Sequence, residues 1–336
     1  MAAGENVPSL YGVAALSNDD VWAAGKTGTG KRSRPAVAHW DGRTLQVLYP
    51  APPSVHGSLL VISATAGDDV WVAGEETIPR VANTTPLLFH WDGHDWRAAA
   101  LPRLPPDSEV SDVKALTRDD VWAVGAAGPD RALALHYDGA VWRNSDIRSV
   151  SGGGTSLSAV DGSSPNDVWA VGGKDYDEPT TFAWSDLILH WNGEKWSEID
   201  TRFDDATGVT ADGVAVAPWQ AIWTLHSDKS GTYISKIVRW NGWTRSAVTV
   251  SDFYPPGEEE LYSITPVDRR DVWVLGQRCP DFNNCTALVL HWSGHGWRTE
   301  KTPFDRLPDT EPTDAATIPG SHDLWVAGDH ILAQYR

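Results

Sequence analysis

The sequence contains little of what a membrane protein or an uncleaved precursor requires. No stretch of its 336 residues approaches the 18 or more apolar residues that cross a bilayer. Residues 1–10 lack the apolar core of a signal peptide. We therefore expect no membrane insertion. Long helices are excluded as well, because no segment keeps a helical period of apolar residues.

Positive charge is scarce. The chain has 27 lysines and arginines against 45 aspartates and glutamates, for a formal net charge of −18. Because such a surface repels phosphate backbones and anionic lipids, we exclude nucleic acid as a partner. We also expect a monomer. We interpret the acidic segments near Asp107, Asp205, Glu259 and Asp309 as serving solubility, with a cationic ligand or a divalent cation as the alternative, and no motif supports a resident metal.

Signatures of common enzymes and cofactor sites are missing. There is no GxSxG elbow, HExxH helix, EF-hand loop or GxGxxG fingerprint. Residues 25–31 resemble a phosphate-binding loop, but Arg32 and Pro35 follow where Ser or Thr and a helix are needed. We interpret this stretch as a basic loop. We expect no cofactor, and we favour recognition over catalysis.

Cysteine is limited to Cys279 and Cys285. Five residues between them suit a small disulfide-closed loop, with two free thiols as the alternative. The pair lacks the further ligands of a zinc site. Since only nine residues precede the first expected strand, we favour an exported chain trimmed at its N-terminus over a cytoplasmic one.

Tryptophan, in contrast, is abundant, with 19 residues. Seven of them recur at intervals of 47 to 54 residues, and six of these follow Asp-Val or Asp-Leu and precede a glycine by three positions. The seven are Trp22, Trp71, Trp122, Trp169, Trp223, Trp273 and Trp325. A period near 50 indicates a repeat protein.

A second motif follows each of the first six tryptophans. It consists of His or Arg, an aromatic residue, Asp, Asn or Ser, and then Gly, as in His39-Trp40-Asp41-Gly42. Asp-Gly and Asn-Gly between strands favour tight hairpin turns, since both central residues tolerate positive φ. Each repeat therefore predicts four short strands.

Four strands in every ~50 residues make one blade of a β-propeller. The sequence predicts an all-β chain, a single seven-bladed β-propeller of four-stranded antiparallel blades, with an open solenoid of hairpins as the alternative. The expected blades are 10–54, 55–107, 108–153, 154–206, 207–256, 257–309 and 310–336. We expect residues 1–9 to complete the last blade. Otherwise it keeps three strands, or a native N-terminal segment is missing.

The paired motifs resemble a widespread bacterial Trp-rich β-propeller repeat of the form Asp-Val-Trp-Ala-Val-Gly followed by His-Trp-Asn-Gly-x-x-Trp. The resemblance covers the whole chain. It implies the propeller fold and no particular function, because many proteins share such a scaffold. WD40 repeats, which end in Trp-Asp, and kelch repeats, which need paired glycines, do not match.

Histidine precedes the second-motif aromatic in five repeats. These residues are His39, His90, His136, His190 and His291. Because the five lie in separate blades, they cannot share one metal ion. We expect each to hydrogen-bond within its own blade, to the aspartate of the first motif.

Function is expected where the repeats differ. The fifth repeat has lost the aspartate before its tryptophan and carries His226 where the others keep glycine, which we interpret as a drifted repeat position, with a base at the channel mouth as the alternative. The loops after the second strands also differ in length and composition, and loops commonly carry recognition. The candidate ligand-binding residues are Lys26, His56, Arg131, Tyr176, Asp177, Trp184, Tyr254 and Arg278.

Two hypotheses follow. We expect a recognition module that binds a peptide, protein or glycan on the loop face, where Trp184 beside acidic residues suits a sugar or a cation. The alternative is a lyase, cyclase or hydrolase at the mouth of the channel. Its catalytic residues would be His226 as general base, with Glu259 or Asp205 as its partner or as a metal ligand.

Overall fold

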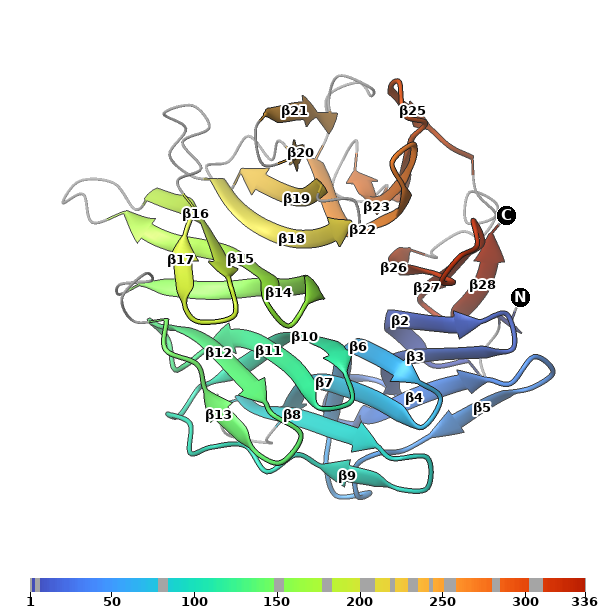
Figure 1. Cartoon of the computed structure of the whole chain (residues 1–336). Helices are drawn as coiled ribbons and strands as arrows, with labels where there is room; N and C mark the ends of the chain where they lie inside the picture. Colours follow the sequence, from blue (N-terminus) through green and yellow to red (C-terminus); the bar gives the residue numbers. More distant parts are fainter. Residues whose placement is uncertain are drawn as a thin grey trace. The chain divides into compact units, whose positions relative to one another are not determined.

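The computed structural model of the chain consists almost entirely of β-strands (Figure 1). It describes residues 2–3, 7–77, 84–147, 154–176, 183–199, 209–217, 221–228, 235–241, 244–250, 258–279, 285–301 and 311–335. Within these ranges the only helix is one 3-10 turn, η1 (Gly30–Arg32). The strands form seven four-stranded antiparallel sheets. The predicted fold class, a seven-bladed β-propeller, is therefore confirmed.

One compact unit comprises residues 1–145 and 313–336 and contains four blades. The first is β2 (Ser9–Ser17), β3 (Asp20–Thr27), β4 (Arg34–Trp40) and β5 (Leu45–Leu48). The next two are β6 (Gly57–Ala66), β7 (Asp69–Thr77), β8 (Thr84–Trp91) and β9 (Trp96–Ala98), then β10 (Glu109–Thr117), β11 (Asp120–Ala126), β12 (Ala132–Tyr137) and β13 (Trp142–Asn144). The last is β26 (Pro312–Thr317), β27 (Leu324–Gly328) and β28 (Ile331–Tyr335) with β1 (Ala2–Ala3).

The second compact unit, residues 146–312, contains three blades. They are β14 (Thr155–Ser164), β15 (Asp167–Tyr176), β16 (Ala183–Trp191) and β17 (Trp196–Glu198), then β18 (Val209–Ala217), β19 (Ala221–Asp228), β20 (Ser235–Trp240) and β21 (Arg245–Thr249), then β22 (Glu258–Asp268), β23 (Asp271–Cys279), β24 (Thr286–Trp292) and β25 (Trp297–Thr299). We number the blades one to seven in chain order. In this unit the first strand of each blade contacts the first strand of the next.

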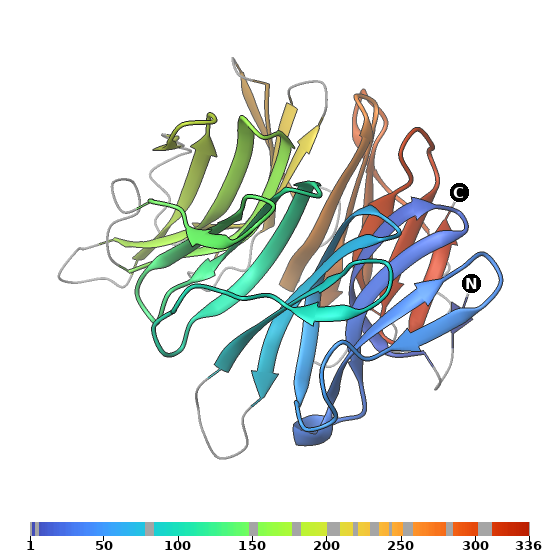
Figure 2. The same ribbon diagram turned by 60° about the horizontal axis from the view of Figure 1, so that its bottom comes forward.

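The seventh blade is completed by the other end of the chain. Ala2 pairs with Leu332 and Ala3 with Ile331. The His330 imidazole donates from Nδ1 to the Val7 carbonyl oxygen at 2.6 Å. The N-terminal residues thus supply the outer strand that the last repeat lacks, and the two termini lie side by side (Figure 2).

The repeated aspartate and histidine of each blade are hydrogen-bonded to each other. In five blades the histidine Nε2 lies 2.7–2.9 Å from Oδ1 of the first-motif aspartate. The pairs are His39–Asp20, His90–Asp69, His136–Asp120, His190–Asp167 and His291–Asp271. The imidazole also stacks on the first-motif tryptophan, with ring centroids 3.8–4.2 Å apart. The expected blade-internal role of these histidines is confirmed.

The hairpin turns after the second motif have the predicted backbone. Five of their glycines have φ between +85° and +94°, a region that favours glycine. In the first blade the Asp41 carboxylate accepts the backbone N–H groups of Arg43 and Thr44, and these bonds hold the pKa of Asp41 below its ordinary value. The turn residues therefore satisfy the backbone where each third strand ends.

The apolar core of each unit lies between neighbouring blades. Trp22 packs with residues of the second blade such as Leu59 and Val72, and Trp71 packs with Val113 and Leu135 of the third. In the second unit Trp223 lies in one cluster with Val272 and Leu288 of the sixth blade. The repeated tryptophans thus join the blades. Among the described residues, no helix has the length and hydropathy needed to span a membrane.

The aspartate–histidine pairs predict a loss of stability in acid. Burial alone would raise the pKa of Asp69, but hydrogen bonds from His90 and Thr65 outweigh burial and hold this pKa below 3.8. The hydrogen bond from His190 lowers the pKa of Asp167 to about 2. Both carboxylates ionise more easily in the folded chain than in the unfolded chain. Their contribution is complete above pH ~4 and is lost as the pH falls toward 2.

Thermal unfolding measured between pH 6 and pH 2 tests this prediction. We expect an almost constant melting temperature above pH ~4.5 and a steep decrease below pH ~4. Asp167→Asn should flatten part of that decrease, because the asparagine does not titrate. A melting temperature that is unchanged down to pH 2.5 would contradict the stabilising role of these pairs.

Candidate functional site

The sequence-predicted site residues fall into three groups. Asp177, Asp205 and Tyr254 lie outside the described residues, and only the backbone of Tyr176 is described. Lys26, His56 and Arg131 belong to three different blades of the first unit. Trp184, His226, Glu259 and Arg278 belong to the second unit. The second unit therefore contains described residues of both functional hypotheses, whereas the first unit contains candidates of the recognition hypothesis alone.

His226 lies on β19 with its side chain only 3% exposed. Its Nε2 is 2.7 Å from the Thr224 hydroxyl, and its Nδ1 is 4.0 Å from Oδ2 of Asp186 on the neighbouring blade. The nearby carboxylate favours the tautomer with the proton on Nδ1, which leaves Nε2 to accept from Thr224. His226 is thus held between two polar groups from two blades.

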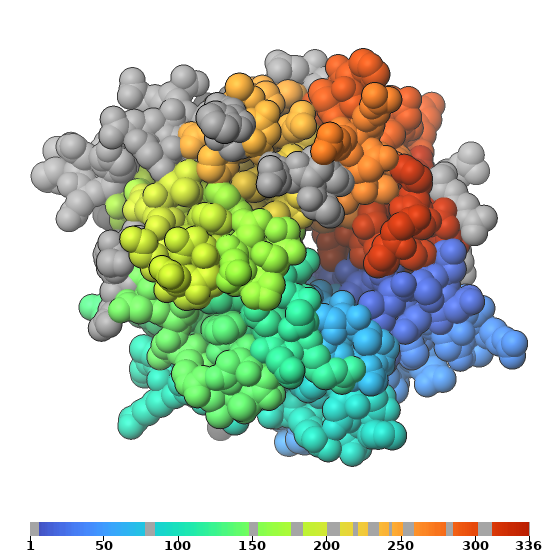
Figure 3. Space-filling model, in the orientation of Figure 1, coloured from blue at the N-terminus to red at the C-terminus, as the bar shows by residue number. Residues whose placement is uncertain are grey.

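A second set of hydrogen bonds lies on the first two strands of the same blade. Asp212 accepts from the Thr210 hydroxyl at 3.0 Å and from the Ser227 hydroxyl. Thr210 and Ser227 are direct cross-strand partners, as are Ala211 and His226. We call Asp186, Thr210, Asp212, Thr224, His226 and Ser227 the polar cluster. It joins the fourth blade to the fifth, whose yellow-green and yellow-orange surfaces lie next to each other in Figure 3.

The charges around His226 oppose one another. Burial lowers the pKa of His226, Lys236 lowers it further, and the carboxylates of Asp186 and Asp212 act in the opposite direction. The net shift is downward, so the imidazole is neutral at pH 7. A neutral imidazole beside two carboxylates and one lysine leaves the polar cluster with a net negative formal charge. The cluster therefore suits hydroxyl or amine donors better than anions.

Trp184 provides an apolar surface beside the cluster. It is one of the few large apolar side chains that are exposed, at 38%. It lies two residues before Asp186 on β16, and alternate strand residues share one face of a sheet. Gly173 leaves room for this ring, because a Cβ there would lie 3.3 Å from the Trp184 ring and 2.9 Å from the Thr210 methyl group. The indole thus lies against the edge of the polar cluster.

Asp186, Asp212 and Thr224 are site residues that the sequence analysis missed. Asp186 lies four residues before the second-motif histidine of its repeat. The other repeats with that histidine have proline or alanine at this position, namely Pro35, Pro86, Ala132 and Ala287. Thr224 stands where the other repeats have only alanine or valine. Asp212 is the bulge residue of its first strand, between Ala211 and Gly213, and bulges redirect side chains. Comparing every position of the repeats, and not only the motif positions, could have found Asp186 and Thr224.

Glu259 and Arg278 lie on the first two strands of the sixth blade, and the Glu259 carbonyl oxygen accepts a hydrogen bond from the Ser235 hydroxyl of the fifth blade at 2.8 Å. Glu259 and Arg278 are direct cross-strand partners. Burial raises the pKa of Glu259, and the charge of Arg278 opposes that shift. The carboxylates that act on His226 are Asp186 and Asp212, not Glu259. The expected partnership of His226 with Glu259 stays a prediction.

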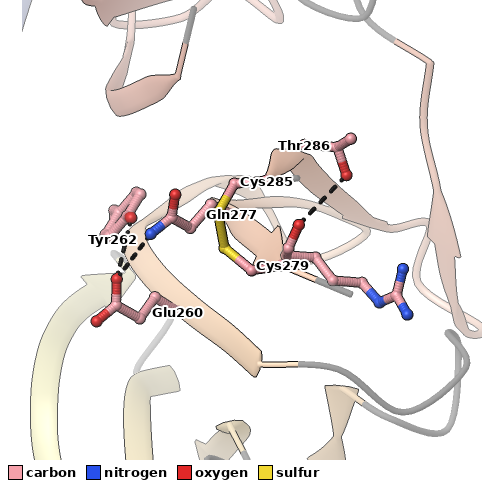
Figure 4. The surroundings of a disulfide bond; sticks show 7 residues. Glu260, Tyr262, Gln277, Cys279, Cys285 and Thr286 are labelled. Atoms are coloured by element: carbon pink, nitrogen blue, oxygen red, sulfur yellow. Dashed lines mark hydrogen bonds between the residues drawn. A yellow bond between two sulfur atoms is a disulfide. The ribbon is translucent and has the colours of Figure 1, made fainter. Parts of the chain in front are cut away.

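Cys279 and Cys285 form the expected disulfide at the end of β23 (Figure 4). On the adjacent strands the Glu260 carboxylate accepts hydrogen bonds from Tyr262 at 3.1 Å and from Gln277 at 2.9 Å. Burial, together with the Glu260 charge, raises the pKa of Tyr262. The disulfide thus closes the connection beside a polar group of the sixth blade. Within the described ranges, no group of three or more His, Cys, Asp and Glu side chains is placed to hold a metal ion.

Comparisons with known proteins reveal a shared fold. No family model matches the chain, and no curated protein is similar enough in sequence to be a recognisable relative. Among solved structures, YCF48 from Cyanidioschyzon merolae is 14% identical with a TM-score of 0.60, over 99% of this chain and 97% of that one. The fucose-specific lectin from Aleuria aurantia is 11% identical with a TM-score of 0.53, over 90% and 99%.

A third structure is larger than this chain. The GH74 xyloglucanase from Xanthomonas campestris is 12% identical with a TM-score of 0.68, over 99% of this chain but 52% of that one. At these identities the likeness extends to the propeller fold alone. The chain is therefore similar in fold to a lectin, to a glycoside hydrolase and to YCF48.

Proposed function

We propose that the chain is a glycan-recognition module whose binding site is the polar cluster together with Trp184. The observation that carries the proposal is the exposed Trp184 ring beside Asp186 on one strand, against hydroxyl and carboxylate groups of the next blade. The proposal narrows the ligand from a peptide, protein or glycan to a glycan.

A sugar ring matches both parts of this site. One face of a pyranose carries C–H groups, which pack against an aromatic plane, while its edge carries hydroxyls. The Trp184 indole offers the plane. The Asp186 carboxylate offers acceptors for a pair of hydroxyls, and charge-assisted hydrogen bonds are the stronger ones. The net negative charge of the cluster favours a neutral or an amino sugar over a uronic acid.

The geometry favours binding over turnover. A general base must reach the proton that it removes, yet the His226 side chain is almost completely buried and its Nε2 contacts Thr224. We infer that His226 orients Asp186 and Thr224 and does not contact the sugar. The solved structures support carbohydrate recognition as a use of this fold, since they include a fucose-specific lectin and a xyloglucanase.

Calorimetric titration with a panel of neutral, amino and acidic oligosaccharides tests the proposal. We expect one class of neutral or amino sugar to bind the wild type. Trp184→Ala should weaken binding at least tenfold, because the apolar contact is lost, and Asp186→Asn about tenfold, because the acceptor loses its charge.

Two matched control variants lie in the first unit. Tyr49→Ala removes another exposed aromatic side chain, and Asp130→Asn neutralises an exposed aspartate in the loop between β11 and β12. Both should bind the sugar as the wild type does. The absence of binding to every sugar, or equal binding by Trp184→Ala, would contradict the proposal. New reducing ends or unsaturated products during incubation would support the enzyme hypothesis instead.

By the same proposal the chain functions in an oxidising, extracytoplasmic compartment, because disulfides persist there and not in the cytosol. Thiol titration of protein isolated from its native compartment should find no free thiol. Two free thiols would contradict this localisation.

A further inference from the structure

Three cations occur together on the hairpin that joins β3 to β4. Lys31 and Arg32 belong to the η1 turn and are exposed, while Arg34 begins β4 and is half-buried. In Figure 2 this turn is the short blue helix at the lower edge. No carboxylate among the residues that the structure describes forms an ion pair with any of the three. The hairpin therefore keeps its positive charge, in a chain whose formal net charge is −18.

Other exposed cations of the chain are paired with a neighbouring carboxylate. The pairs of guanidinium and carboxylate groups include Arg97–Asp92 at 2.8 Å, Arg118–Asp68 at 2.6 Å and Arg298–Glu300 at 2.5 Å. The hairpin differs from these places, because its three cations lie together without an acid. Such a group of cations is available to an anion from outside the chain.

Backbone hydrogen bonds fix the shape of the hairpin. The backbone N–H and the hydroxyl of Ser33 both donate to the Gly30 carbonyl oxygen, at 3.1 and 2.7 Å. The Ser33 carbonyl oxygen accepts from the Gly57 N–H of the second blade at 3.0 Å. A partner therefore meets cations on a backbone that is already ordered, which lowers the entropic cost of binding.

Arg34 is held over the ring of Tyr49. Its guanidinium carbon lies 4.1 Å from the ring centroid, and the tyrosine is 43% exposed. A guanidinium group over an aromatic ring keeps N–H groups at the edge of its plane, where a carboxylate can accept two of them. Pro52 and Pro53, which follow Tyr49 in the chain, are exposed as well. The cations thus border an exposed apolar strip.

Lys26 is the fourth cation of this hairpin, but it faces elsewhere. Thr27 is the cross-strand partner of Arg34, so Lys26 lies on the opposite face of the sheet. Its ammonium group is 5.3 Å from the centroid of the Tyr11 ring. The surface on the other side consists of Lys31, Arg32, Arg34 and Tyr49, and we call it the basic surface.

We propose that the basic surface binds a short acidic peptide segment in which an apolar side chain lies between carboxylates. The carboxylates pair with Lys31, Arg32 and Arg34, and the apolar side chain packs on Tyr49. A lone phosphate or sulfate would use the cations and leave the apolar strip exposed, so the strip favours a peptide. Because the chain as a whole is negative, the attraction is confined to the hairpin and suits a short segment. The basic surface lies in the first unit and does not depend on the proposed glycan binding.

Fluorescence anisotropy of a labelled peptide, Glu-Glu-Leu-Glu-Glu, added to the full chain tests this inference. We expect saturable binding that weakens as NaCl rises from about 50 to about 300 mM, because salt screens exposed charges. The same peptide with glutamine in place of glutamate should not bind. Lys31→Gln/Arg32→Gln should weaken binding at least tenfold. Tyr49→Ala should weaken it about threefold, since Arg34 loses its aromatic support.

A matched control removes the same charge elsewhere. Arg43→Gln/Lys195→Gln changes two exposed cations outside the hairpin and should bind the peptide as the wild type does. Trp184→Ala should also bind it normally, which separates the basic surface from the proposed glycan site. Absence of peptide binding, or equal binding by Lys31→Gln/Arg32→Gln and its control, would overturn the proposal. Tighter binding of a heparin hexasaccharide than of the peptide would overturn it in favour of a sulfated sugar.

Discussion

Asp69→Ala should lower the free energy of unfolding by about 3 kcal/mol, because it removes a buried carboxylate that accepts two hydrogen bonds. The Asp69 side chain has no exposed surface. It receives hydrogen bonds from His90 at 2.7 Å and from Thr65. Without the carboxylate, the half-buried imidazole and hydroxyl lose their acceptor. Chemical denaturation followed by tryptophan fluorescence measures the loss.

Two comparisons make this prediction specific. Asp167→Ala breaks the same kind of pair, but the Asp167 side chain is 38% exposed. Water can therefore hydrogen-bond to the groups that lose the carboxylate. The decrease in the free energy of unfolding should be well under half of that for Asp69→Ala. The fifth blade naturally has Ala221 and Arg239 instead of the pair, with the Arg239 guanidinium 5.4 Å from the Trp223 ring. Asp69→Ala/His90→Arg should therefore recover about 1 kcal/mol of the single-variant loss. Equal losses for Asp69→Ala and Asp167→Ala would contradict the account.

Trp71→Ala should have the largest effect on stability, about 4 kcal/mol, because it opens a cavity between two blades. Trp71 is 2% exposed and contacts Tyr137 and Trp142 of the next blade. The matched variant is Trp184→Ala, which removes an exposed indole and should change the free energy of unfolding by less than about 0.5 kcal/mol.

The two tryptophan variants should also differ in sugar binding, and here the larger loss belongs to Trp184→Ala. A folded fraction of Trp71→Ala should bind as the wild type does, while Trp184→Ala should not. The comparison needs one denaturation curve and one titration for each variant. Comparable destabilisation by the two substitutions would mean that the repeated tryptophans and Trp184 have the same structural role, contrary to our interpretation.

The repeat made the fold predictable from the sequence. Trp22 and His39 are cross-strand partners that recur in five blades, so one pattern defined the strands, the turns and the hydrogen bond between the motifs. The N-terminal strand was expected only as a means of completing the last blade, since Ala2 and Ala3 carry no strand pattern of their own. They pair with β28 because the backbone N–H and C=O groups on its outer edge would otherwise lack strand partners.

The site was only partly predictable, because its residues come from strands that are distant in sequence. His226 was identified as a departure from the repeat, and Trp184 as an aromatic residue beside acids. The partnership of His226 with Asp186 spans 40 residues and depends on how the fourth and fifth blades pack. Asp212 depends on a bulge that its sequence does not signal. The expected role of Glu259 beside His226 relied on a shared loop face and stays a prediction; on the sheet, Glu259 is the cross-strand partner of Arg278.

The central claim is that the repeated residues build the blades and that departures from the repeat create the site. The most direct test is the sugar affinity of Thr224→Ala/His226→Gly, which restores the repeat residues in the fifth blade. Five other blades have glycine at the position of His226, and the first strand of the blade lies close to it. A Cβ there would be 2.0–2.1 Å from a backbone carbonyl oxygen of that strand. We predict a folded variant, with a melting temperature within a few degrees of the wild type, that binds the sugar at least tenfold more weakly. A folded variant with unchanged sugar affinity would contradict the claim.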